Sequence, residues 1–285
     1  MPRLACGLIS EYSQHRAVRL LLGEQARVIL VVALVAVDDD VLGRGNQTVL
    51  DAAEAAREVI LLQHIANGVI IDSRTVQIAP DVVIAPGAVI LAGTILRGRT
   101  VIGAGCIIGP NTLIEDSIVD EGSTVNASQV YSSHIGPHNN IGPFTHVRVN
   151  TVTDYGVHLG AYVETKNSNF ARGNTVSHLT YIGDSDVGKY CNFGCGTVTC
   201  NYDGKDKFRT QIGDYCFIGC NTNLVAPVKV GDGAYTAAGS TITKDVPAQA
   251  LGIARERQTN LEGWAEPKME AYIAQKKKLE DEQSK

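Results

Sequence analysis

The chain has 285 residues, of which 44% are hydrophobic, 6% are aromatic and 29 are glycines. Its net charge of −5 argues against a general nucleic-acid-binding surface, and no apolar run is long enough to span a bilayer. The seven cysteines lack the spacing of a disulfide framework, which indicates a reducing compartment, and we expect a cytoplasmic protein. From the charge and the short apolar runs we expect no nucleic-acid partner and no membrane partner.

The first 68 residues predict a strand followed by a helix. Residues 1–24 show no clear period, residues 27–37 include an apolar run typical of a buried strand, and residues 48–66 have apolar residues at helical spacing. Asn67 and Gly68 are residue types that commonly end a helix. We therefore expect residues 1–68 to form a first, small unit.

A six-residue period dominates the next segment, residues 69–255. Aliphatic residues recur at every sixth position, and a small residue commonly follows four positions later. This period predicts a parallel β-helix, in which each repeat is one short strand and a corner and the aliphatic side chain points into the coil. The repeated aliphatic residues are Ile78, Ile84, Ile90, Leu96, Ile102, Ile108 and Ile114, then Ile212, Ile218, Leu224, Val230 and Ile242.

The period is disturbed in two places. Residues 148–181 look irregular, and residues 199–211 form a polar insert that we expect to project as a loop. Interruptions of a rigid scaffold commonly carry function. The polar residues that gather in these two stretches are Arg148, Lys166, His178, Tyr181, Asn201, Tyr202 and Lys207. Residues 256–285 are a Lys- and Glu-rich tail, expected to be an exposed helix or disordered.

The segments Ser-His-Leu-Thr-Tyr-Ile-Gly-Asp (177–184) and Cys-Asn-Tyr-Asp-Gly (200–204) point to a known family. With residues 157–166 and 218–228 they resemble the acetyltransferase half of the bifunctional N-acetylglucosamine-1-phosphate uridylyltransferase/glucosamine-1-phosphate N-acetyltransferase. The resemblance covers about residues 69–267. It implies a left-handed β-helix, a homotrimer with active sites between subunits, and acetyl-CoA-dependent N-acetylation of glucosamine 1-phosphate. That reaction serves UDP-N-acetylglucosamine synthesis, which feeds peptidoglycan and lipopolysaccharide.

The resemblance also assigns a catalytic base. The amine of glucosamine 1-phosphate must lose a proton as it attacks the thioester, so a base that titrates near neutral pH is useful. His178 matches the family's base and lies in a dense polar motif. The remaining histidines are expected at surface or corner positions.

Substrate contacts follow from the same resemblance. The phosphate should draw cations, and Arg148, Lys166 and Lys207 match that role. The family usually has proline after this arginine, whereas Val149 stands here. Further matching substrate-binding residues are Glu164, Tyr181 and Asn192.

Cofactor contacts are implied for Asn201, Tyr202, Ala238 and Arg255. Cys195 and Cys220 stand where the family commonly has alanine and serine, and both should point outward, toward the coenzyme A groove. Cys106, Cys191 and Cys216 occupy small inward positions and should be core residues. Cys191, Cys195 and Cys200 do not have zinc spacing, and magnesium is not expected for acetyl transfer.

Residues 1–68 resemble the last stretch of the uridylyltransferase domain, and most of that domain has no counterpart here, so we expect no uridylyl transfer. Two alternatives to the acetyltransferase stay open. One is a hexapeptide acyltransferase for a different small acceptor, against which the phosphate-type cations argue. The other is a protein that transfers nothing, either a γ-class carbonic anhydrase or a structural β-helix. The carbonic anhydrase needs a third histidine to join His134 and His138.

Overall fold

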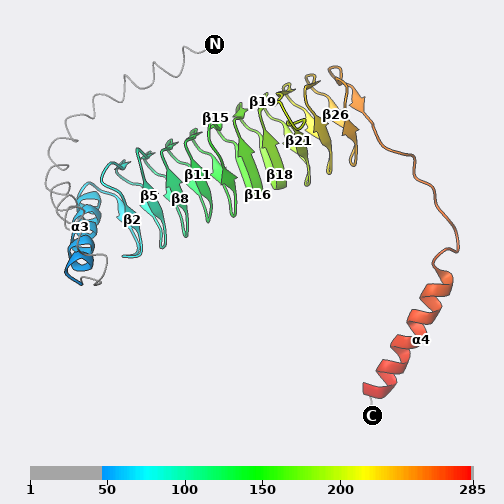
Figure 1. Ribbon diagram of the computed structural model, residues 1–285, viewed down its shortest axis with the longest axis horizontal. Coiled ribbons are helices and arrows are strands. Elements are labelled where there is room, and N and C mark those ends of the chain that lie inside the picture. Colours follow the sequence, from blue (N-terminus) through cyan, green and yellow to red (C-terminus); the bar gives the residue numbers. More distant parts are fainter. Residues whose placement is uncertain (1–46, 284–285) are drawn as a thin grey trace. The chain divides into compact units, whose positions relative to one another are not determined.

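The computed structural model describes residues 47–283, which divide into two compact units between Ala254 and Arg255. The strand predicted at residues 27–37 and the ambiguous residues 1–24 lie outside the described residues. The first described element is helix α3 (Gln47–Ala66), which agrees with the predicted helix and is followed by Gly68 at φ +85° (Figure 1). The second unit contains helix α4 (Glu266–Gln283), whose residues 266–282 are exposed.

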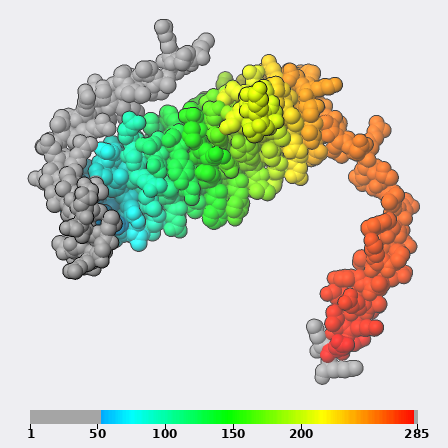
Figure 2. Space-filling view, in the orientation of Figure 1, coloured from blue at the N-terminus to red at the C-terminus, as the bar shows by residue number. Residues whose placement is uncertain are grey.

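The β-helix consists of parallel strands, most of them two or three residues long, which pair coil to coil. One face is a nine-stranded sheet. Its strands are β3 (Val83–Ile84), β6 (Val101–Ile102), β9 (Ile118–Val119), β12 (His134–Ile135), β15 (Val152–Thr153), β17 (Asn169–Phe170), β19 (Ser185–Val187), β22 (Thr210–Ile212) and β25 (Val228–Val230). Figure 2 shows the coils following one another in sequence order, from cyan to yellow.

The two other faces join into one 19-stranded sheet. The first of them contains β1 (Ile70–Ile71), β4 (Val89–Ile90), β7 (Ile107–Ile108), β10 (Thr124–Val125), β13 (Asn140–Ile141), β20 (Asn192–Phe193), β23 (Phe217–Ile218), β26 (Tyr235–Thr236) and β28 (Leu251–Gly252). The second contains β2 (Gln77–Ile78), β5 (Ile95–Arg97), β8 (Leu113–Glu115), β11 (Gln129–Tyr131), β14 (His146–Val147), β21 (Val198–Cys200), β24 (Asn223–Val225) and β27 (Thr241–Ile242).

Two long strands join these faces and correct one expectation. Residues 148–181 look irregular in sequence, yet their backbone continues the coils in register. The segment includes β16 (His158–Lys166) and most of β18 (Thr175–Gly183), nine residues each, which run from one face through a corner onto the next (Figure 1). The period is hard to see in the sequence because Thr153 and Thr165 take inward positions that are aliphatic elsewhere, and the next inward residue, Phe170, follows after five positions in place of six.

The core is a stack of the periodic aliphatic residues. Ile90, Leu96 and Ile108 are at most 1% exposed, and the other members of the series are likewise buried. Such burial removes apolar surface from water and stabilises each coil through its neighbours. The predicted fold, a left-handed parallel β-helix of hexapeptide repeats with a C-terminal helix, is confirmed.

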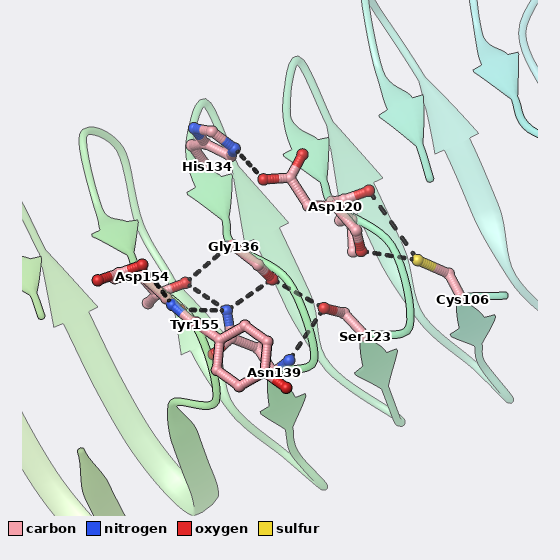
Figure 3. Close-up of polar contacts among 10 residues, drawn as sticks. Cys106, Asp120, Ser123, His134, Gly136, Asn139, Asp154 and Tyr155 are labelled. Atoms are coloured by element: carbon pink, nitrogen blue, oxygen red, sulfur yellow. Dashed lines mark hydrogen bonds and ion pairs between the residues drawn. The ribbon is translucent and has the colours of Figure 1, made fainter. Parts of the chain in front are cut away.

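Small polar side chains inside the corners form a second stack, drawn in Figure 3. The Sγ of Cys106 donates to the Asp120 carbonyl at 3.0 Å, and the Oγ of Ser123 donates to the Gly136 carbonyl at 2.8 Å. One coil further, the Asn139 amide donates to the Gly136 carbonyl at 2.7 Å and to the Asp154 carbonyl at 2.9 Å. Its oxygen accepts from the Val157 N–H. Corner carbonyls that point away from the strand ladder are satisfied in this way.

Asn139→Ala should lower the free energy of unfolding by about 2 kcal/mol, because it leaves buried backbone groups without partners. Asn140→Ala, in the exposed neighbouring position of β13, is the matched control and should change it by less than about 0.5 kcal/mol. Urea unfolding monitored by circular dichroism measures both. Equal effects of the two variants would contradict the role given to Asn139.

Candidate functional site

His178 heads a column of outward-facing residues along one corner of the β-helix. It lies in the middle of β18, is exposed, and precedes Leu179, whose φ of +37° turns the chain at the corner. Backbone hydrogen bonds of 2.8–2.9 Å tie this corner to the following coils, from Gly196 N to Leu179 O, Asn221 N to Cys195 O, and Gly239 N to Cys220 O.

The pairing register fixes the order within this column. Val176 pairs with Phe193 and Phe193 with Ile218, which places His178 next to Cys195 and Cys195 next to Cys220. Ile218 pairs with Thr236, which places Cys220 next to Ala238. All four residues are exposed. We call His178, Cys195, Cys220 and Ala238 the corner column; it brings the predicted base and three predicted cofactor residues together.

Three cations gather on the face that follows this corner. Val147 pairs with Thr165, which sets Arg148 beside Lys166 on the next coil. Contact with Lys207 and the charge of its ammonium group lower the pKa of Lys166, with smaller contributions from desolvation and Arg148, while Asp184 opposes them. Arg148 also pairs with Glu164, Nη1 to Oε1 at 2.6 Å. Five of the predicted substrate residues, with Tyr181 paired to Glu164, thus lie in one area.

A glycine leaves room for the tyrosine at this site. Gly183 pairs with Lys166 in the sheet. A Cβ at Gly183 would clash with the Tyr181 hydroxyl group and would lie 2.9 Å from Nδ2 of Asn201. The Tyr181 ring therefore lies over Gly183, between the cations and the start of the projecting loop.

The loop that carries Lys207 is anchored at both ends. Asp184, buried at 6% exposure, accepts hydrogen bonds from the side chains of Asn167 and Asn201. At the other end Arg209 grips Asp186 with two hydrogen bonds of 2.9 and 2.6 Å, which raises the pKa of Arg209 and lowers that of Asp186. An isolated bridge joins Tyr202 to Lys207, so the predicted projecting loop is confirmed as a short folded-back segment.

Sequence reasoning missed Gly183, Asp184 and Arg209. Gly183 and Asp184 end the Ile-Gly-Asp segment of the quoted motif. Arg209 lies two residues after Lys207, at the end of the loop. A glycine-acid pair directly after a dense polar motif is the signal that could have drawn attention to them.

Two predicted site residues lie elsewhere. Asn192 is exposed in β20, on the face that precedes the His178 corner. Arg255 is the first residue of the second compact unit. Asn201 is buried with its amide donated to Asp184, which gives it a structural contact in addition to the predicted one.

Comparison with known proteins gives two family matches. Residues 78–186 match the GMPPB C-terminal domain, and residues 209–244 match the bacterial transferase hexapeptide (six repeats). The bifunctional protein GlmU of Clostridium beijerinckii is 45% identical over 238 residues, covering 83% of this chain and 52% of that protein. The predicted resemblance to this bifunctional family is confirmed.

Another relative matches over a shorter stretch. GlmU of Caldicellulosiruptor saccharolyticus is 53% identical over 143 residues, covering 50% of this chain and 31% of that protein. The aligned part of this chain thus spans a third to a half of the length of these GlmU proteins. Among solved structures, UDP-N-acetylglucosamine acyltransferase of Francisella novicida matches with a TM-score of 0.47 and 17% identity, covering 65% of this chain and 67% of that one. No helix in the described part of the chain is long and apolar enough to cross a membrane.

Lys207→Gln should raise the pKa of Lys166, because it removes the charge that most disfavours the protonated form. In the folded wild type the repulsion is present in full below the lowered pKa and is relieved as pH rises through it. Side-chain NMR titration of Lys166 measures the change. Lys205→Gln, in the same loop, should leave the Lys166 titration unchanged. An unaltered Lys166 pKa in Lys207→Gln would show that the two ammonium groups do not meet in solution.

Proposed function

We propose that this chain transfers the acetyl group of acetyl-CoA to the amine of glucosamine 1-phosphate, producing N-acetylglucosamine 1-phosphate. The observation that carries the proposal is the meeting of Arg148, Lys166 and Lys207 on the face that follows the His178 corner, where Lys166 pairs with Gly183, five residues after His178. The pKa of Lys166 is lowered because Lys207 lies close to it. A bound phosphate would neutralise the repulsion among these cations, so the group is suited to a phosphate ligand. The 45% identity to GlmU over 238 residues supports the same acyltransferase type.

In this proposal each chain residue has a chemical task. His178 takes the proton that the amine loses when it attacks the thioester carbonyl. Arg148 grips the phosphate through its guanidinium fork, and Lys166 and Lys207 add point charges. The Tyr181 hydroxyl group hydrogen-bonds the substrate, and Glu164 holds Arg148 in place while it faces the sugar hydroxyls.

The corner column fits the arm of the coenzyme. Cys195, Cys220 and Ala238 are small and exposed, so they leave a shallow track that starts at His178. A thioester placed along this track would bring its carbonyl carbon to the base. Asn201 and Tyr202 complete the proposed cofactor set of this unit, and the contact of Arg255 with a phosphate of the coenzyme stays a prediction from the sequence.

A homotrimer completes the proposed site. Asn192 lies on the face before the His178 corner, whereas the cations lie on the face after it, and one narrow coil cannot turn both toward one small sugar. A neighbouring subunit facing the corner would supply the missing side. The cytoplasmic location of the protein stays a prediction. The lack of uridylyl transfer by these residues also stays a prediction. It is tested by measuring pyrophosphate release from UTP in the presence of N-acetylglucosamine 1-phosphate and magnesium.

Transfer to a different acyl acceptor is the main alternative. A preference of the enzyme for glucosamine 1-phosphate over glucosamine would favour the proposed acceptor. For the carbonic anhydrase alternative, His134 Nε2 lies 2.7 Å from Asp120 Oδ2, and the His138 ring is tilted by 56° against Tyr155 with centroids 5.1 Å apart, so the two histidines have separate partners. The described residues contain no group of three or more His, Cys, Asp or Glu side chains placed to hold a metal.

His178→Ala should lower kcat for acetylation of glucosamine 1-phosphate by roughly 10²–10⁴, the usual contribution of a positioned base, with little change in acetyl-CoA affinity. His158→Ala, one coil before His178 and on the preceding face, is the control and should keep near-normal kcat. Thiol release from acetyl-CoA and calorimetric titration measure the two quantities. A His178→Ala enzyme within about threefold of wild type would remove His178 from catalysis.

Lys166→Met should raise KM for glucosamine 1-phosphate by roughly 10- to 100-fold, because one charge-assisted contact to the phosphate is worth about 1.5–3 kcal/mol. The KM for glucosamine itself, which lacks the phosphate, should be unchanged by the substitution. A parallel loss for both acceptors would place Lys166 away from the phosphate. The alternative acceptor is favoured if wild-type enzyme does not prefer the phosphorylated sugar.

A further inference from the structure

The corner column contains a nucleophile beside the base. Cys195 follows His178 on the next coil, and the strands of neighbouring coils lie about 4.8 Å apart. Cys195 is exposed and is a free thiol. A histidine next to a cysteine is the arrangement that activates a thiol for attack on a carbonyl carbon.

The other described thiols are less suited to this chemistry. Cys106, Cys191 and Cys216 are buried, and burial raises the pKa of Cys200. Only thiolate attacks, so these four are disfavoured by access or by protonation. Cys220 is exposed but lies one coil further from His178. Its Sγ lies over Gly194, since a Cβ built on Gly194 would be 2.8 Å from that sulfur.

We propose that Cys195 accepts the acetyl group from acetyl-CoA when no amine acceptor is bound. The inference rests on the proposed function, because that function brings the thioester to the corner column. His178 takes the proton of the Cys195 thiol, and the sulfur attacks the carbonyl carbon. The bond between that carbon and the coenzyme sulfur breaks, and the leaving thiolate takes the proton from His178.

This step exchanges one thioester for another, so it needs no oxidant, reductant or further reactant. It is reversible, since coenzyme A can attack the acetyl-cysteine in return. The chain thereby holds an acetyl group beside its base in the absence of acceptor. The alanine that the family commonly has at residue 195 has no nucleophile, and the serine that it commonly has at residue 220 could form only an ester, so neither residue can carry a thioester.

The experiment is intact-mass spectrometry of the full chain incubated with acetyl-CoA without sugar. We expect a gain of one acetyl group, located by digestion at Cys195 and removed by neutral hydroxylamine, as a thioester is. Cys195→Ala should lose the label. Cys200→Ser, the matched control, should keep it, and His178→Gln should slow its formation by roughly 10²-fold or more.

The outcomes separate this inference from the proposed function. Acetylation of glucosamine 1-phosphate by wild type without any label on Cys195 would overturn the inference and leave the function standing. Label on Cys220 or Cys200 at the same rate as on Cys195, unaffected by His178→Gln, would indicate nonspecific acetylation and also overturn it. Neither label nor acetyl transfer would overturn both.

Discussion

Parallel stacking of one coil on the next, in register, is the constraint on which every other feature of this protein depends. Backbone N–H groups of the strands bond to carbonyls one coil away, as from Gln77 to Thr94 and from Ile95 to Thr112, both at 2.8 Å. Residues at one coil position therefore line up in a column along the axis. Aliphatic residues form the core this way, and His178 obtains its neighbours in the same way.

Stacking also brings charges together that the sequence keeps far apart. Arg148 and Lys166 sit side by side because their preceding residues pair, and the loop between Asn201 and Thr210 returns Lys207 to the same place. Such crowding of like charges is unfavourable in the folded chain alone. Its persistence depends on rigid anchors, of which Asp184 and the Arg209–Asp186 pair are the clearest. Fixed anchors of this kind favour a preformed anion site over one assembled on binding.

The fold could be predicted from the sequence because a hexapeptide period is a direct record of the coil. Ile84, Ile90 and Leu96 are buried as that period requires. The grouping of Arg148, Lys166 and Lys207 was expected only through resemblance, since pairing across coils is not visible in a linear pattern. Gly183 and Asp184 were missed for a related reason: their roles depend on the Tyr181 ring and the Asn201 amide, which belong to other positions on the coil. The order His178, Cys195, Cys220 and Ala238 likewise required the register, because a 25-residue step that includes the loop separates the two cysteines.

Helix α3 has a consequence for how this protein behaves as a particle. A solenoid of parallel strands ends in a row of backbone groups that lack a following coil, and such rows recruit further strands. Ile60 and Leu61 of α3 are buried in the same core cluster as Val69 and Ile78 of the first coils. The helix therefore acts as a lid on that end, where its curved surface offers no extended edge to copy. Addition of a further strand at this end is therefore disfavoured by geometry, without any need for charge repulsion.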